Sequence, residues 1–217
     1  MLKVWGRATS SNVQKVMWAI GEIGLDHERI DVGASYGGLD TEAYGKLNPN
    51  RLVPTLEDGD LVIWESNAIV RYLASRYDAG GLWPNDPDER ALADQWMDWL
   101  PTTLLANFVA VFFGLVRIPP EHRDMAATNK AIERLNQNYR LLDIHMAGRD
   151  FIAGDRLTMG DIPLGMTLYR FYDMAFERPS LPHVEAWYAR LQERPAYREH
   201  VMVSYDALRN DIIPKKT

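Results

Sequence analysis

Two patterns of apolar residues divide the chain near residue 80. Before this point, short apolar runs typical of strands alternate with segments whose apolar residues recur at helical spacing. After it, only helical spacing is found. Expected strands cover 3–6, 27–32, 53–56 and 61–64, and expected helices cover 12–24, 41–47 and 65–77. The order is βαβ followed by ββα, which predicts a small mixed sheet of thioredoxin-like arrangement.

Between the two patterns lies a segment rich in glycine and proline, residues 79–88, which we interpret as a linker. We therefore expect an N-terminal α/β domain over 1–78 and an all-helical domain over 89–217. The expected helices of the second domain cover 89–116, 121–148, 158–172, 181–194 and, more briefly, 197–203. Pro101 lies inside the first of them and should kink it or interrupt a turn.

Composition excludes several classes of function. The 217 residues carry a net charge of −6, and no basic run is longer than Lys215-Lys216, which argues against a nucleic-acid partner. There is no cysteine, so disulfides, thiolate metal sites and a nucleophilic cysteine are excluded. The five histidines are scattered without metal-ligand spacing, so we expect no metal.

The same reading of the sequence predicts a cytoplasmic protein with no membrane partner. The N-terminus lacks the apolar core of a signal peptide. The longest apolar run, 108–116, is far shorter than the ~20 residues needed to cross a bilayer. The segment 33–37 matches the G-x-S-x-G pattern of serine hydrolases, but a glycine-rich loop follows it, so we interpret it as a loop.

Three short segments remain that could bind a ligand. Val53-Pro54 begins a strand, and a cis peptide there would leave the main-chain groups of Val53 free to pair with a bound peptide; a trans edge proline without a ligand is the alternative. Ser66 begins a helix, where the amide groups attract an anion, while Glu65 offers an acceptor for an ammonium. Ser66 could equally be a simple helix cap.

Ser10, Ser11 and Asn12 begin the first expected helix in the same way. In a thioredoxin-like sheet the starts of both helices should lie at one edge. We therefore expect Ser10, Val53 and Ser66 to converge on one groove.

With these residues in place, the chain resembles the cytosolic glutathione transferases over essentially its whole length. Residues 48–56, NPNRLVPTL, are similar to the family's N-P-x-x-x-V-P-x-L segment. Residues 65–69, ESNAI, are similar to its E-S-x-A-I segment. Residues 151–155 and 158–162 are similar to its C-terminal capping box.

The resemblance implies glutathione as co-substrate and assigns a role to each matching residue. Pro54 would be the cis-proline, and Val53 would pair its main chain with the cysteinyl unit. Glu65 and Ser66 would hold the γ-glutamyl head, and Arg51 occupies a position that often binds the glycine carboxylate. Thr158 and Asp161 would form a structural helix cap rather than a catalytic pair.

The residue that activates the thiol should lie within residues 9–15. No tyrosine or cysteine is present there, so the segment resembles the serine-type theta, delta and related bacterial groups. Spacing favours Ser10 as the donor to the thiolate, with Asn12 second; Ser11 is the neighbour that a one-residue slip would select, and it is otherwise expected to contact glutathione.

The thiolate would attack a small hydrophobic electrophile lying against the helical domain. Four aromatic residues are candidate walls for that substrate: Trp99, Phe108, Phe112 and Tyr169. Other activities compatible with the resemblance are a glutathione-dependent disulfide reductase, a glutathione-dependent isomerase or dehalogenase, and a non-catalytic ligand-binding protein. The resemblance also implies a homodimer.

Overall fold

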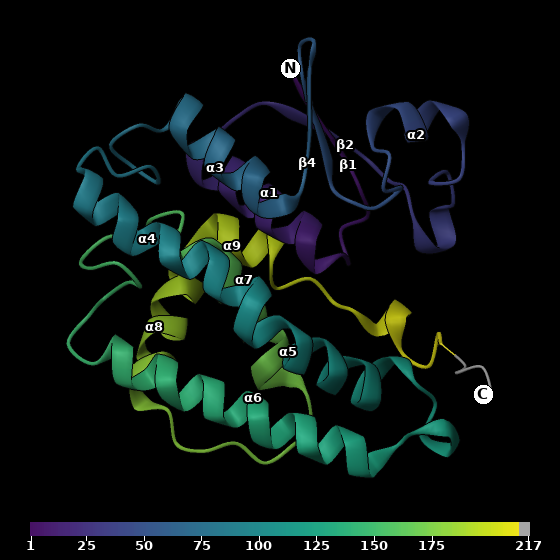
Figure 1. Cartoon of the computed structure of the whole chain (residues 1–217), viewed down its shortest axis with the longest axis vertical. Coiled ribbons are helices and arrows are strands. Elements are labelled where there is room, and N and C mark those ends of the chain that lie inside the picture. The colour runs from purple at the N-terminus through teal and green to yellow at the C-terminus, as the bar shows by residue number, and fades with distance from the viewer. Residues whose placement is uncertain (213–217) are drawn as a thin grey trace. The chain divides into compact units, whose positions relative to one another are not determined.

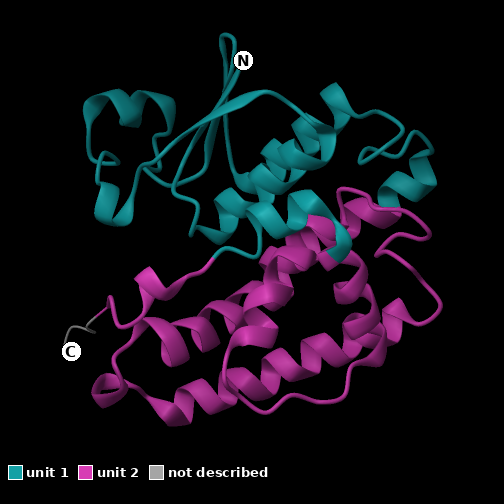
Figure 2. Cartoon of the chain, turned by 180° about the vertical axis from the view of Figure 1, so that it is seen from behind, with its two compact units in different colours: residues 1–91, 193–203 teal, residues 92–192, 204–217 magenta. Residues whose placement is uncertain are grey.

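The computed structural model describes residues 1–212, so Lys215-Lys216 lie outside the described residues. The contacts within the chain divide it into two compact units (Figure 2). Unit 1 contains Met1–Ala91 and Glu193–Val203, and unit 2 contains Leu92–Gln192 and residues 204–212. The boundaries expected from the sequence assign 193–203 to the helical domain instead, because its helical spacing does not reveal which element it packs against.

Unit 1 is built on a four-stranded sheet with the order β2-β1-β3-β4. Its strands are β1 (Leu2–Trp5), β2 (His27–Ile30), β3 (Thr55–Asp58) and β4 (Leu61–Trp64). β1 pairs with β2 in parallel, and the other two pairs are antiparallel. In the register, Val4 lies opposite Arg29 on one side and Leu56 on the other. The predicted thioredoxin-like arrangement is confirmed.

The helices α1 (Ser11–Ile23) and α3 (Ser66–Tyr77) pack side by side, and α2 (Glu42–Leu47) lies on the other side of the strands (Figure 1). α1 ends where Gly24 takes φ 76°, a conformation that glycine adopts without steric cost, and the Gly24 amide donates to Ile20. The unit is completed by α9 (Pro195–His200), which packs on α1.

The contact between α9 and α1 is both aromatic and ionic. The rings of Trp18 and Tyr197 meet edge to face with centroids 4.8 Å apart, and both side chains are fully buried. Arg194 donates two hydrogen bonds, of 2.8 and 2.6 Å, to the carboxylate of Glu22. Residues more than 170 positions apart in the sequence therefore pack together in unit 1.

Unit 2 is helical, as predicted. Its α-helices are α4 (Pro87–Trp99), which starts in unit 1, α5 (Leu105–Phe112), α6 (Met125–Met146), α7 (Asp161–Asp173) and α8 (Pro182–Glu193). π-helical turns at Leu100–Leu104 and Phe113–Arg117 flank α5. Pro101 lies in the first of these turns, so the predicted interruption is confirmed; a proline has no amide hydrogen to complete a regular turn.

The helical stretch Pro87–Arg117 is longer than the apolar run 108–116 because the π-helical turns continue it. By length and composition it could cross a membrane, although one such stretch is weak evidence. One face of the stretch is buried, including Met97, Leu104 and Phe108.

The start of α7 is held by Asp161, which is fully buried. Its carboxylate accepts hydrogen bonds from the amide of Ile152 at 2.8 Å and from the amide and hydroxyl of Thr158 at 2.9 and 3.2 Å. Burial raises the pKa of Asp161 to about 7. The predicted capping box of Thr158 and Asp161 is present only in part: the carboxylate of Asp161 accepts from both groups of Thr158, whereas Gly160 holds the N-cap position of α7 and no side chain caps this helix.

Candidate functional site

Ser10 occupies the N-cap position of α1, and its hydroxyl makes no capping hydrogen bond. The side chain is 9% exposed. Its segment is fixed by two other contacts: the Ser10 amide donates to Arg7 at 3.1 Å, and the Gln14 side chain donates to the carbonyl of Ala8 at 3.1 Å. The main chain at Ser10 is therefore held in place, and its hydroxyl is not used to cap the helix. Ser11 is the first residue of the helix itself.

The starts of α1 and α3 meet through a chain of polar side chains. The Ser66 hydroxyl donates to Asn12 Oδ1 at 3.3 Å. The ammonium of Lys15 donates to Ser66 Oγ at 3.2 Å and to Asn67 Oδ1 at 3.2 Å. These contacts bring together Asn12 and Ser66, two residues selected from the sequence. They also reveal Lys15 and Asn67, which sequence reasoning missed.

Val53 and Pro54 lie beside the start of α1, and the peptide bond between them is cis, as predicted. A Cβ placed on Gly6, at the end of β1, would collide with Val13 and lie 3.2 Å from the Cβ of Val53. Only a glycine at position 6 permits this approach. Within residues 1–212, no hydrogen bond joins the main-chain groups of Val53 to another residue.

The loop before Val53 is held by two buried side chains, Asn48 and Tyr44. Asn48 donates to the carbonyl of Leu52 at 2.9 Å and to Thr55 Oγ1 at 3.2 Å, and its own oxygen accepts from the amide of Asn50 at 2.9 Å. The hydroxyl of Tyr44 donates to the same Leu52 carbonyl at 2.7 Å. Asn48, the first residue of the NPNRLVPTL segment, thus fixes the position of Val53.

Glu65 immediately precedes α3 with φ 72° and ψ 110°. A non-glycine residue with positive φ is uncommon and costs of order 1–3 kcal/mol, and such residues cluster at functional sites. The side chain of Glu65 is exposed whereas Ser66 beside it is buried. The strained residue therefore places a carboxylate at the surface next to the first amides of α3.

Arg51 also has a positive φ, of 53°, but its side chain is engaged elsewhere. The guanidinium donates to the carbonyls of Leu39 and Thr41, both at 2.8 Å, and packs close to Gly45. These contacts tie the loop of Arg51 to α2. They favour a supporting role for Arg51 over direct contact with a ligand carboxylate.

Lys15 is the most perturbed cation of this group. Only 3% of the residue is exposed, and burial lowers the pKa of Lys15 to about 8 even though the nearby charge of Glu65 raises it. Desolvation therefore outweighs the attraction of Glu65. No local pattern in the sequence identifies this residue, because its burial follows from the packing of α1 against α3.

The four aromatic residues proposed as substrate walls lie in unit 2. Phe108 and Phe112 are 2% and 5% exposed and stack on each other with centroids 6.5 Å apart. Their burial favours a packing role. Trp99 and Tyr169 are half-buried, and their rings contact Trp96 and Tyr205, respectively. Trp99 and Tyr169 stay the better candidates for contact with a substrate.

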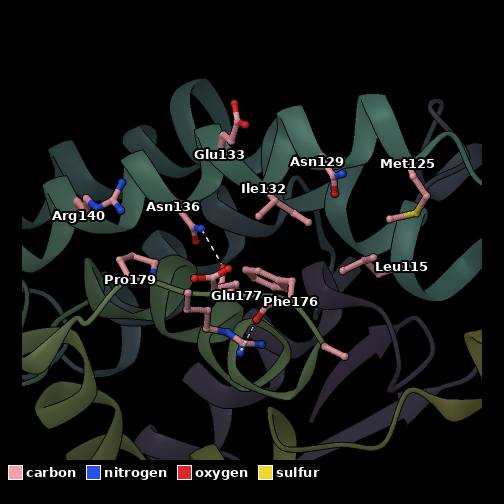
Figure 3. Close-up of a pocket in the computed structure, with 12 residues that line it drawn as sticks. Leu115, Met125, Asn129, Ile132, Glu133, Asn136, Arg140, Phe176, Glu177 and Pro179 are labelled. Carbon is pink, nitrogen blue, oxygen red and sulfur yellow. Dashed lines mark hydrogen bonds between the residues drawn. The ribbon is translucent and has the colours of Figure 1, made fainter.

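Figure 3 shows a separate cavity of about 560 Å³ between α6 and the segment 175–179. Asn136 spans one side of it by donating to the carbonyl of Glu177 at 3.1 Å. None of the residues selected from the sequence lines this cavity. Among residues 1–212, no group of three or more His, Asp or Glu side chains is arranged to hold a metal ion.

The G-x-S-x-G segment forms a short 3₁₀ turn, Ala34–Tyr36, with Ser35 exposed to solvent. Neither a strand leading directly into it nor a helix leaving it is present. The geometry of a hydrolase nucleophile is therefore absent at this turn.

Comparison with known proteins identifies the family. The model of the glutathione S-transferase N-terminal domain matches residues 1–75, and that of the C-terminal domain matches residues 105–195. Glutathione S-transferase GstB of Escherichia coli is 40% identical over 205 residues, which cover 94% of this chain and 99% of that protein. Glutathione S-transferase D6 of Drosophila melanogaster is 29% identical, with 92% of each chain covered.

A solved structure agrees with these relatives. The theta class glutathione S-transferase of Xanthomonas axonopodis pv. citri, with glutathione bound, is 48% identical and superposes with a TM-score of 0.90. The match covers 94% of this chain and 98% of that chain. In fold and in sequence over nearly its whole length, the chain belongs to the glutathione S-transferase family.

Proposed function

We propose that the protein binds glutathione in unit 1, ionises its thiol and adds the thiolate to a small hydrophobic electrophile. The observation that carries this proposal is the junction of α1 and α3, where Asn12 and Ser66 are in hydrogen-bond contact at 3.3 Å. This junction brings the amide groups that begin both helices close together. Such groups attract anions, and glutathione offers two in this arrangement, the γ-glutamyl carboxylate and the thiolate.

Each part of glutathione has a proposed partner. The free main-chain groups of Val53 would pair with the cysteinyl unit in the manner of an added strand. Ser66 and the first amides of α3 would bind the γ-glutamyl carboxylate, and exposed Glu65 would accept a hydrogen bond from the α-ammonium. The glutathione-bound relative from Xanthomonas axonopodis supports this ligand.

Ser10 is proposed as the donor to the thiolate because its hydroxyl is not used to cap α1. A thiol of pKa ~8.5 is only a few per cent ionised at pH 7. A hydrogen bond to a charged group is worth ~1.5–3 kcal/mol, and each pKa unit corresponds to ~1.4 kcal/mol. One hydroxyl donor therefore lowers the thiol pKa by ~1–2 units. No general base is needed at neutral pH.

The experiment is an ultraviolet titration of the thiolate of bound glutathione. Ser10→Ala should raise the thiol pKa by ~1–2 units, while Ser11→Ala, the matched control one residue along, should leave it within ~0.3 units. A larger effect of Ser11→Ala would transfer the role to Ser11. An unchanged titration in both variants would reject a serine donor.

Two assays run side by side distinguish the transferase activity from the alternative reductase activity. Conjugation of a chlorinated aromatic compound tests the transferase, and reduction of a small disulfide tests the reductase alternative. We expect conjugation to dominate, with the protein acting in the cytoplasm as a homodimer. Calorimetry showing no glutathione binding, together with no activity in either assay, would leave only a non-catalytic role.

A further inference from the structure

Lys15 is a buried cation that the proposed chemistry does not use. It lies in α1 within a continuous run of buried residues, from Val13 to Ile20. Taking an ammonium out of water costs several kcal/mol unless charged partners and hydrogen bonds compensate. An apolar side chain of similar length would fill the same space without that cost. A lysine at this position therefore requires a reason other than packing.

The partners of Lys15 all belong to the start of α3. Its two hydrogen-bond acceptors among residues 1–212 are the neutral oxygens of Ser66 and Asn67, each at 3.2 Å. The charged group that acts on it is the carboxylate of Glu65. An ammonium has three N–H donors, so one remains after these two contacts. The cation is thus aimed at the helix start without being neutralised by a direct ion pair.

The same contacts orient Ser66. Its hydroxyl oxygen accepts a hydrogen bond from Lys15, and its hydroxyl hydrogen is donated to Asn12. The hydroxyl is therefore oriented before a ligand binds. A hydroxyl that accepts from a cation becomes a stronger donor, because hydrogen bonds in a chain polarise one another. A carboxylate that replaces Asn12 as acceptor would receive this strengthened bond.

The charge of the ligand gives a second reason for a cation at the start of α3. The γ-glutamyl head of glutathione is a zwitterion, and Glu65 matches only its ammonium. With Glu65 alone, the start of α3 would repel the ligand carboxylate, apart from the partial charge of the helix dipole. Arg51 does not compensate, because its guanidinium donates to the carbonyls of Leu39 and Thr41.

We propose that Lys15 is a positioning residue for the γ-glutamyl carboxylate of glutathione. Its ammonium holds Ser66 and Asn67 at the start of α3 and supplies the positive charge that this carboxylate requires. The inference rests on the proposed glutathione site and adds to it a residue from the buried side of α1.

The test is isothermal calorimetry with two ligands that differ by one carboxylate. The first is S-methylglutathione, which has a thioether in place of the ionisable thiol. The second is its analogue in which a 4-aminobutyryl group replaces the γ-glutamyl group, so that only the α-carboxylate is lost. The proteins are the unaltered chain, Lys15→Met, Lys15→Arg and the control Lys3→Met, which removes an exposed lysine of β1.

Lys15→Met should weaken S-methylglutathione at least ~10-fold, as expected for loss of a charge-assisted contact, yet bind the aminobutyryl analogue within ~2-fold of the unaltered chain. Lys15→Arg should recover most of the loss, and Lys3→Met should bind both ligands normally. In turnover, the loss should raise KM for glutathione and leave kcat within ~2-fold, because the contact is made equally in the ground and transition states.

Two results would overturn the proposal. Equal weakening of both ligands by Lys15→Met would show a structural role, and no weakening of either would show no role. If the unaltered chain itself fails to bind S-methylglutathione, the proposed glutathione site falls and this inference falls with it. Equal affinity of the unaltered chain and of Lys15→Met for S-methylglutathione removes the inference alone.

Discussion

Replacing Lys15 with methionine should change the stability of the ligand-free protein in a direction that depends on pH. Burial lowers the pKa of Lys15 from 10.5 to about 8. At ~1.4 kcal/mol per pKa unit, the buried charge costs about 3 kcal/mol at pH 7. Methionine removes this cost but also removes the hydrogen bonds that Lys15 donates to Ser66 and Asn67, and each lost bond costs about 1 kcal/mol. The variant should therefore be more stable at pH 7 by about 1 kcal/mol.

The sign reverses at high pH. The folded pKa of Lys15 lies below its unfolded value, so the unfolded chain binds more protons between about pH 8 and pH 10.5. The contribution of Lys15 to the free energy of unfolding of the unaltered protein therefore rises with pH through that window. Once Lys15 is neutral in both states, only the two lost hydrogen bonds count, and the variant should be less stable by about 2 kcal/mol.

Urea denaturation followed by tryptophan fluorescence at pH 7 and at pH 10.5 measures both values. The informative quantity is the change in the difference between the two proteins, about 3 kcal/mol, because titration of all other groups cancels. The control Lys3→Met should show a difference that does not vary with pH. A Lys15→Met variant that loses the same stability at both pH values would refute the reasoning, since Lys15 would then be uncharged or solvated at pH 7.

Three further substitutions test the framework of the site. Asn48→Ala should lower stability by about 2–3 kcal/mol and weaken glutathione binding, because the Leu52 carbonyl loses a donor; unfolding and calorimetry on one preparation check both, and normal binding would show that Tyr44 suffices. Arg51→Leu should weaken the binding of glutathione and of γ-glutamylcysteine equally. A loss of affinity for glutathione alone would instead show that Arg51 binds the glycine carboxylate. Asp161→Ala should cost about 2–4 kcal/mol in thermal unfolding without changing the glutathione dissociation constant.

Secondary structure was largely readable from the sequence because its signals are local. The strand Leu61–Trp64 has the predicted bounds, and the start of α1 was predicted within one residue from the cluster of serines and Asn12. The strand β3 was predicted to begin two residues too early, at Val53. The apolar pattern does not show where pairing with β1 begins, and in the structure pairing starts at Thr55. The interruption of the regular helix at Pro101 follows from the chemistry of proline alone.

The candidate site was predictable only where a motif exists. Asn48, Val53, Glu65 and Ser66 belong to segments with a recognisable order. Lys15 does not, because a lysine in an amphipathic helix is usually solvated, and only packing of α1 against α3 shows that this one is buried. The engagement of Arg51 with carbonyls of the α2 region likewise depends on a tertiary contact that no local pattern encodes.

The place of α9 has a consequence for how the chain is made. Unit 1 needs Glu193–Val203, yet Leu92–Gln192 must be synthesised first, which takes ~5–20 s on a ribosome. During that interval the face of α1 that carries Trp18 has no Tyr197 to cover it. The nascent N-terminal unit therefore emerges with an open apolar surface that a chaperone can hold. A fragment ending at residue 91 should need a supplied α9 peptide to become soluble and compact.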